Sequence, residues 1–237
     1  MSQTDPFDRR QNLYAEVEAL ISSHNGKKSV MAYTMYTLRK NGRVSVMLEF
    51  IEPPGYKDTR ILIGVPKEGG FPDVAVMMNF FAVPFRIKAL SRAMPFFGMD
   101  INSEDMNPRN PSYDTNRIMG TLLSESGTEM LIVESLPLIQ SAYGKRVHYI
   151  DTRNHMCLKI EYFDKNGKPA KLLEVLETDT INGIFTAVKI KMSDLQKKSH
   201  TVLTYKNVAY GGDHSRFINE TYLRTGRIPE TGTVQTE

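Results

Sequence analysis

The sequence predicts a mainly β protein, because apolar and polar residues alternate in one short run after another. Turn signals such as Asn41-Gly42 and Asn182-Gly183 separate these runs, and Asn-Gly pairs are typical of β-hairpins. Counting the runs between turn signals gives about ten to twelve strands. No internal repeat or linker interrupts the 237 residues, so we expect one domain over residues 1–225 and a polar, mobile tail over residues 226–237.

An N-terminal helix is predicted to precede the strands. Asp5 is a suitable cap, and Pro6 fits the first helical position, where its missing N–H costs nothing. An apolar stripe at the spacing of a helix follows and ends near Asn25-Gly26: Leu13, Val17, Leu20 and Ile21. Packing on the sheet is favoured over a membrane-surface helix, because the polar face carries Glu16 and Glu18 but few cations.

Strands follow along most of the chain. In the first part they are predicted at residues 29–39, 43–51, 58–66 and 73–81. Alternation in the second of these places four apolar side chains on one face, which we expect to be buried: Val44, Val46, Leu48 and Phe50. Later strands are predicted at residues 117–125, 128–136, 145–151, 155–163, 171–179, 184–192 and 201–210, and a terminal helical turn at 217–223.

The central stretch, residues 85–107, has an unusual composition for a connection. It begins as a strand with Phe85, Ile87 and Ala89 on one parity, and Pro95 then breaks the run. The turn that follows holds Phe96-Phe97-Gly98, although connecting segments generally face water. We therefore expect this stretch to fold back over apolar surface as a lid.

Composition excludes several classes of protein. The net charge of +3 comes from 30 basic and 27 acidic residues without a basic block, which argues against nucleic-acid binding. Cys157 is the single cysteine and has no partner for a disulfide or a zinc motif. No apolar run is long enough for a transmembrane helix, and MSQTDPFDRRQN lacks the apolar region of a signal peptide. This leaves a cytoplasmic protein or an exported one whose signal peptide has been removed.

Signals for catalysis or metal binding are weak. The sequence contains no GxSxG, HExxH, P-loop or GxGxxG motif. His148, Asp151 and His155 could ligate a metal, but strand alternation favours surface positions. Three acidic residues follow the turn: Asp100, Glu104 and Asp105. They could hold a cation or act as a carboxylate pair. The favoured interpretation is that they cap a helical turn and accept backbone N–H bonds. We expect no cofactor, no metal and no enzymatic activity.

Several stretches together resemble a known family. They are ALSRAMPFFGMDINSEDM, HYIDTRNHMCLKIEYFDKNGKPAKLLEV, NGIFTAVKIKMSD, KKSHTVLTYKNVAY and FINETYL, in this order. They resemble the bacterial outer membrane lipoprotein-sorting protein family, whose members are relatives of the LolA/LolB lipoprotein carriers. The resemblance covers residues 13–223. Met99 stands where the family usually has a small polar residue, and Ser103 where it has an aromatic one.

The resemblance implies a strongly curved antiparallel sheet, a half-barrel, covered by the N-terminal helix and the central lid. It implies a periplasmic carrier that binds acyl chains of a lipoprotein or lipid, takes part in outer-membrane lipoprotein sorting or lipid transport, and touches membranes only peripherally. The alternative is a non-catalytic accessory subunit of an envelope transport complex, such as an RND-type exporter, in which the half-barrel packs solid.

Two groups of candidate site residues follow. Thirteen methionines supply pliable apolar surface that suits variable apolar ligands, although core filling explains any single one. The expected lining of the cavity and lid is Met31, Tyr33, Met35, Met47, Met78, Phe96, Phe97 and Met99. A basic stripe beside the lid could meet anionic head groups or an acidic partner, although a solvated strand face is favoured: Arg86, Lys88 and Arg92.

Overall fold

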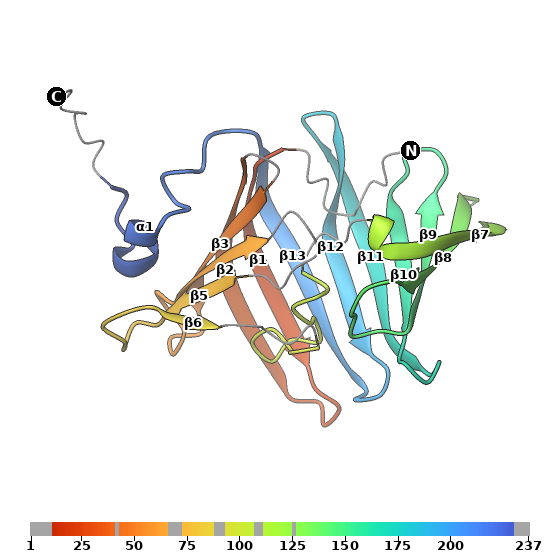
Figure 1. The fold of residues 1–237 in the computed structure, drawn as a ribbon, viewed down its shortest axis with the longest axis horizontal. Helices are drawn as coiled ribbons and strands as arrows, with labels where there is room; N and C mark the ends of the chain where they lie inside the picture. The colour runs from red at the N-terminus through yellow and green to blue at the C-terminus, as the bar shows by residue number, and fades with distance from the viewer. Residues whose placement is uncertain are drawn as a thin grey trace. The chain divides into compact units, whose positions relative to one another are not determined.

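The computed structural model describes residues 11–40, 43–65, 73–87, 93–106, 111–124 and 127–229. Over these residues the chain forms thirteen strands, one short 3-10 helix and one α-helix (Figure 1). The prediction of a mainly β fold is therefore confirmed. Among the described helices, none is long and apolar enough to cross a membrane.

The strands make a 13-stranded sheet in which neighbours are hydrogen-bonded in the order β6-β5-β4-β3-β2-β1-β13-β12-β11-β10-β9-β8-β7. Their bounds are β1 Leu13–Ser22, β2 Lys28–Lys40, β3 Arg43–Glu52, β4 Arg60–Val65, β5 Asp73–Met77, β6 Phe85–Ile87, β7 Asp114–Leu123, β8 Glu129–Pro137, β9 Lys145–Asp151, β10 Cys157–Phe163, β11 Pro169–Ile181, β12 Ile184–Asp194 and β13 Ser199–Tyr210. The 3-10 helix η1 is Pro111–Tyr113, and α1 is Glu220–Thr225.

The chain divides into two compact units, which are described separately below. The described residues of the first unit lie within 17–30 and 91–206, and those of the second within 10–16, 31–90 and 207–237. β1, β2 and β13 each contribute residues to both units. The expectation of one domain over residues 1–225 stays a prediction.

The predicted N-terminal helix is wrong over residues 13–22, which form the strand β1. Ala15, Val17, Ala19 and Ile21 alternate in sequence, and all four are buried. Two of the four are alanine, whose small side chain makes the alternation between apolar and polar residues hard to see. The larger Leu13 and Leu20 happen to have the spacing of a helix, which led to the wrong prediction. The predicted cap at Asp5-Pro6 lies outside the described residues.

In the second unit, one face of β3 is buried as predicted. The β2–β3 hairpin pairs Met35 with Leu48 and Tyr33 with Phe50, which places these four side chains on one face. Leu48 and Phe50 are buried, whereas Val44 and Val46 on the same parity are half-buried. The predicted shared face is confirmed, and its burial is complete only at the end nearer Phe50.

The opposite face of the second unit is covered by α1. Met47 on β3 and Ala75 on β5 form a buried cluster with Tyr222 and Leu223 of the helix. Asn219 caps the start of α1, because its side chain accepts a hydrogen bond from the Tyr222 N–H at 2.8 Å. The helix that was predicted as a turn at residues 217–223 is confirmed, shifted a few residues toward the C-terminus.

Hydrogen bonds fasten α1 to the strands beneath it. The Tyr222 hydroxyl donates to Glu49 Oε2 at 2.7 Å, and Arg60 Nη1 donates to the Leu223 carbonyl at 3.3 Å. Arg60 also pairs with Glu49 at 3.2 Å. Burial and the acceptor Glu49 raise the pKa of the Tyr222 hydroxyl. These contacts hold α1 on the face of β3 and β5 that contains Met47 and Ala75.

In the first unit, the strands β7 to β13 carry apolar rows across one face. One row passes through the half-buried His148 of β9 and through Thr201 of β13, and the strand registers align four apolar side chains with them: Val133 of β8, Ile160 of β10, Leu173 of β11 and Met192 of β12. All four are buried. This face is the one on which the central stretch is placed.

Replacing Leu223, which is fully buried, with alanine tests the cover formed by α1. Loss of its contacts with the cluster should lower the free energy of unfolding by about 2–5 kcal/mol. Urea unfolding followed by circular dichroism measures the change. Ile228→Ala is the matched control, since Ile228 is 47% exposed and its replacement should cost less than about 0.5 kcal/mol. Equal losses in the two variants would contradict the assignment of α1 as a packed cover.

Candidate functional site

Residues 93–106, here called the central hairpin, fold back on themselves. Pro95 bridges to Asn102, and the Phe96 N–H donates to the Ile101 carbonyl at 2.8 Å. The reversal occurs at Phe97 and Gly98, whose φ angles are 48° and 75°. Two successive residues with positive φ are typical of the tight turns that close hairpins. Phe97 adopts the left-handed conformation at a steric cost, which the surrounding contacts must offset.

A row of polar side chains lies beside the apolar rows of the first unit. It crosses six strands in register, close to where most of them begin or end, and we call it the rim row: Ser135, Arg146, Tyr162, Lys171, Asp194 and Ser199. All except the half-buried Ser199 are buried. Buried polar groups need partners, and the central hairpin supplies several of them.

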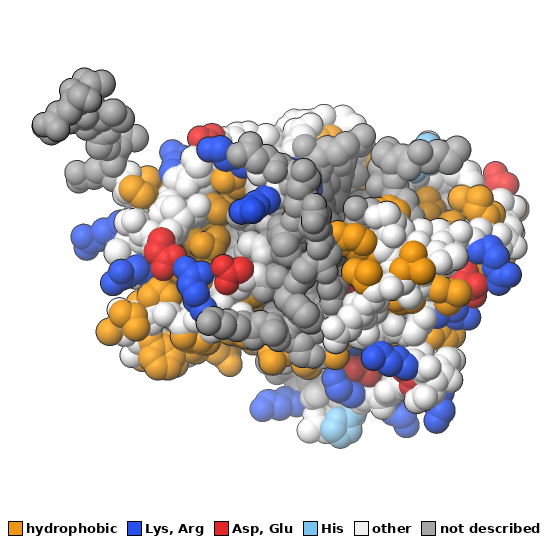
Figure 2. Space-filling model, in the orientation of Figure 1, with side chains coloured by type: hydrophobic (Ala, Val, Ile, Leu, Met, Phe, Trp, Pro, Cys, Tyr) orange, Lys and Arg blue, Asp and Glu red, His pale blue; other side chains and the backbone are white. Residues whose placement is uncertain are grey.

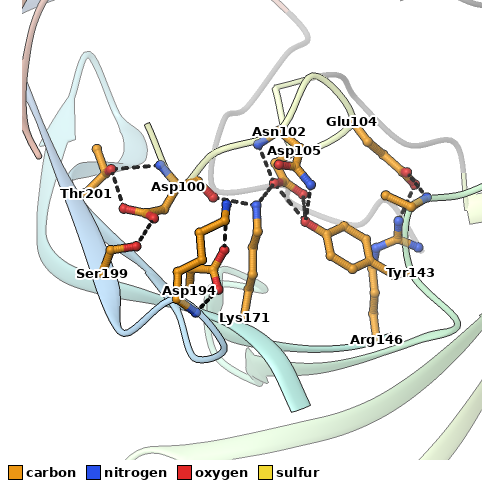
Figure 3. A network of polar contacts seen from close by, with 12 residues as sticks. Asp100, Asn102, Glu104, Asp105, Tyr143, Arg146, Lys171, Asp194, Ser199 and Thr201 are labelled. Atoms are coloured by element: carbon orange, nitrogen blue, oxygen red, sulfur yellow. Dashed lines mark hydrogen bonds and ion pairs between the residues drawn. The ribbon is translucent and has the colours of Figure 1, made fainter. Parts of the chain in front are cut away.

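Asp100 joins the central hairpin to β13 (Figure 3). Its carboxylate accepts hydrogen bonds from the Ser199 hydroxyl at 2.5 Å and from the Thr201 hydroxyl at 2.8 Å. The Asp100 N–H in turn donates to Thr201 Oγ1 at 2.9 Å. Both Asp100 and Thr201 are buried, so these bonds are shielded from competing water.

Lys171 of β11 holds the middle of the hairpin. Its Nζ donates to the Asp100 carbonyl at 2.5 Å and lies 3.4 Å from Asp105 Oδ2. The Tyr143 hydroxyl donates to the same carboxylate at 2.9 Å, and the Asn102 N–H at 2.8 Å. Figure 3 shows these groups converging on Asp105. The carboxylate therefore has a cation and two neutral donors around it.

Burial has the largest effect on the pKa values of Asp105 and Lys171. It raises the pKa of the Asp105 carboxyl against the opposing effect of Lys171, and it lowers the pKa of the Lys171 ammonium against the opposing effect of Asp105. Burial also raises the pKa of the Tyr143 hydroxyl, which stays protonated and a donor. Each charge in the pair depends on the other.

A second ionic anchor lies on β9. Glu104 pairs with Arg146, and its carboxylate also accepts bonds from the Ser141 hydroxyl at 2.7 Å and the Ala142 N–H at 2.6 Å. Both charged side chains are nearly inaccessible, at 5% and 4% exposed for Arg146 and Glu104. Asp114 lies 3.9 Å from the other guanidinium nitrogen of Arg146. The hairpin is thus held at β9, β11 and β13.

The acidic residues were predicted to accept backbone N–H bonds within the lid. Asp105 does so from Asn102, whereas Glu104 accepts its backbone N–H bond from Ala142, outside the hairpin. The remaining partners are hydroxyl groups and cations of the sheet and of the loop before β9. In the part of the chain that the structure describes, no cluster of three or more His, Cys, Asp or Glu side chains could hold a metal ion. The arrangement is an anchor for a loop.

The apolar residues of the hairpin occupy two environments. Met99 and Ile101, next to Asp100, are buried at 2% and 5% exposure. Phe96 and Phe97, at the turn, are half-buried, and their ring centroids lie 4.9 Å apart. The buried pair fixes the hairpin, whereas the two rings keep part of their surface available.

The other predicted cavity residues belong to the second unit. Met31 and Tyr33 are buried, and Met35, on the same parity, is half-buried. Met78 is half-buried in the turn after β5. The predicted closure of the lid over Met31, Tyr33 and Met35 stays a prediction.

Met47 does not share a face with Tyr33 and Met35, so its place in the predicted cavity wall is wrong. The hairpin register pairs Met47 with Tyr36, which puts both on the face covered by α1. Sequence alternation within β3 correctly separated Met47 from Leu48, but only the pairing with β2 shows which residues of that strand lie beside it.

The predicted basic stripe is described only at Arg86. Its guanidinium, 49% exposed, pairs with Asp73 and with Glu220, each at 3.1 Å. Lys88 and Arg92 lie outside the described residues. The suggested metal group of His148, Asp151 and His155 does not form a candidate site in the described residues either: Asp151 binds Arg153 at 3.0 Å.

Sequence reasoning missed Arg146, Lys171, Tyr143 and Thr201. Each stands in or beside a strand where alternation permits a surface position, and nothing local marks it as buried. For Arg146 and Lys171 the signal was a charge near the end of a strand, and its meaning becomes clear only when the strand registers align both residues in the rim row.

Comparison with solved structures shows which proteins share the fold. The fold is shared with a DUF1329 family protein from Desulfovibrio piger, with a TM-score of 0.83 at 21% identity over 91% of this chain and 92% of that one. An outer membrane lipoprotein-sorting protein domain from Vibrio parahaemolyticus gives 0.82 at 19% identity, covering 90% and 92%. A LolA superfamily protein from Nitrosomonas europaea gives 0.71 at 16% identity, covering 91% and 93%. The predicted LolA-like antiparallel sheet is confirmed at the level of the fold, whereas its cover by the lid stays a prediction.

The family follows from the sequence itself. A family model with the description "Uncharacterized protein" matches residues 42–225, which is most of the chain, and the chain belongs to that family. Among curated proteins, none matches the sequence.

Replacing Lys171 with methionine tests the anchor. The substitution leaves the Asp105 carboxylate buried without its cation, and it should lower the free energy of unfolding by about 3–5 kcal/mol. The double variant Lys171→Met/Asp105→Asn should be less destabilised than Lys171→Met, because no charge is left buried alone. Urea unfolding measures both.

Lys189→Met serves as the matched control, because the exposed pair of Lys189 with Glu177 should contribute no more than about 1 kcal/mol. A loss for Lys171→Met no larger than for Lys189→Met would show that the buried pair does not hold the hairpin.

Proposed function

We propose that this protein is a non-enzymatic carrier that binds acyl chains of a lipid or lipoprotein, with the central hairpin as the lid of the binding site. The observation that carries the proposal is the half-buried pair Phe96 and Phe97, held at the tip of a hairpin whose base is tied to the sheet by buried ion pairs. Rings on a firmly anchored base can move aside or close without the hairpin leaving the sheet.

The chemistry of the neighbouring side chains supports an apolar ligand. The aliphatic residues and methionine in the rows of the first unit offer contact area without directional hydrogen bonds. Met99, Met156 and Met192 are among the buried residues of this unit. Flexible, polarizable methionine side chains adapt to chains of differing length and shape.

The proposed cellular location and partners are inferred from the structural neighbours. One structural neighbour is described as an outer membrane lipoprotein-sorting protein domain and another as a LolA superfamily protein. We infer from this that the chain works in the periplasm, receives its cargo from a membrane and contacts that membrane only peripherally. Participation in an envelope transport complex is compatible with either an open or a solid-packed interior.

Native mass spectrometry of protein purified from bacteria tests the carrier proposal directly. A carrier should retain lipid or acyl-chain mass, which organic extraction removes. Absence of any such mass, together with failure of the extracted protein to bind a fluorescent fatty-acyl probe, would leave the solid-packed accessory subunit as the better description.

Replacing Phe97 with aspartate tests the lid. An ionised carboxylate facing an apolar site resists desolvation, so the substitution should abolish binding of a fluorescent fatty-acyl probe. The fold should survive, because aspartate tolerates the left-handed conformation of residue 97 better than phenylalanine does. Probe titration and thermal melting, measured side by side, separate the two effects.

Two control variants accompany this test. Phe97→Leu keeps an apolar side chain and should retain most of the probe affinity. Leu195→Asp adds the same charge at a position of the first unit that is 46% exposed, and it should leave the affinity unchanged. Lost stability without a selective loss of binding in Phe97→Asp would contradict the lid.

A further inference from the structure

The turn between β5 and β6 exposes an unusual amount of apolar surface. Residues 78–85, MNFFAVPF, contain no charged residue. Four of them are large apolar residues with exposed fractions of 65%, 46%, 60% and 40%, in the order Phe80, Phe81, Val83 and Phe85. We call residues 78–85 the aromatic turn.

The aromatic turn has a defined shape. The Phe81 N–H donates to the Met78 carbonyl at 3.0 Å, which closes a turn at the end of β5. Ring centroids of Phe80 and Phe81 lie 4.8 Å apart, and those of Phe81 and Phe85 lie 5.6 Å apart. The rings therefore form one contiguous patch, which Figure 2 shows as orange surface at the lower left, where Figure 1 places the β5–β6 turn.

The strands at the base of the turn are well packed. Val74, Ala75 and Val76 of β5 are buried, and Val76 pairs with Phe85 across the hairpin. Three of the four exposed residues, Phe80, Phe81 and Val83, lie at the tip, and Phe85 is the first residue of the edge strand β6, where it pairs with the buried Val76. Contiguous exposed aromatic side chains on a supported tip indicate an interaction surface.

The charges beside the turn indicate what this surface contacts. Arg86, the basic residue that follows the turn, is already paired with Asp73 and Glu220. Attraction by this cation to an acidic partner is therefore weak, and the apolar rings provide the driving force. Aromatic side chains prefer the boundary between lipid head groups and acyl chains, and an uncharged turn enters that zone without burying a charge.

We propose that the aromatic turn inserts into the interfacial zone of a phospholipid bilayer and docks the protein on it. The docking surface extends the proposed carrier function, since a carrier must reach a membrane, but its residues are not those of the proposed lid. Docking then depends on apolar insertion and is independent of the charge of the head groups.

The composition of the chain allows a direct test. The protein has no tryptophan, so Phe80→Trp introduces a single fluorescent reporter at the most exposed ring. With phosphatidylcholine vesicles its emission should shift to the blue, and brominated acyl chains should quench it. Ile228→Trp after α1 is the matched control: Ile228 is 47% exposed and apolar but lies outside the aromatic turn, and its reporter should not respond.

Removal of the rings should weaken vesicle binding. Phe80→Ser/Phe81→Ser should lower the partition coefficient at least about tenfold, given the transfer free energy of two partly exposed phenylalanine side chains. Addition of anionic lipid or of salt to about 1 M, where screening acts beyond ~3 Å, should change the wild-type coefficient less than the double substitution does. Melting temperature and probe affinity should stay close to wild type.

The outcomes separate docking from cargo binding. An unshifted Phe80→Trp emission with vesicles, or an equal response of Ile228→Trp, overturns the docking proposal whatever the acyl probe does. A shifted emission together with failure of the wild type to bind the acyl probe supports docking and contradicts the carrier.

Discussion

The arrangement of the first unit depends on the need of one buried ammonium group for partners. Lys171 is 6% exposed, and an unpaired charge at that depth would cost several kcal/mol. A sheet cannot supply those partners from its own backbone, because its carbonyl groups are occupied by neighbouring strands. The central hairpin supplies them as the Asp100 carbonyl and the Asp105 carboxylate, so the position of the hairpin is set by the position of one lysine.

A second charged contact fixes the orientation of the hairpin on the sheet. Glu104 meets Arg146 on β9, two strands away from Lys171 in the strand order, and a segment fixed at two separated points cannot pivot. Apolar contacts alone tolerate sliding, because they are non-directional. The hydroxyl bonds of Asp100 to β13 add a third point. The aromatic tip at Phe96 and Phe97 is therefore carried by a base whose position and orientation are fixed.

The sequence predicts most of the strands, but it does not predict contacts that depend on how the strands pair. Alternation in β3 correctly gave the face of Leu48 and Phe50, because large residues mark it, whereas β1 was mistaken for a helix because alanine hides its alternation. The hairpin was recognised from Phe96-Phe97-Gly98, since apolar residues in a turn need apolar surface. Its partners Lys171 and Arg146 were not, because register is a property of two strands and the local sequence of one strand does not contain it.

The cover formed by α1 has a consequence for the order in which the second unit can form. Tyr222 binds Glu49 across 173 positions of sequence, so the part of the cover over Met47 and Ala75 that α1 provides comes from residues near the end of the chain. During synthesis, the hairpins β2 to β5 can pair long before that cover exists, and they present an uncovered apolar face until then. Contacts of such separation slow folding and leave the partly folded chain prone to aggregation. A nascent chain of this protein is therefore a stronger candidate for chaperone binding than the finished fold.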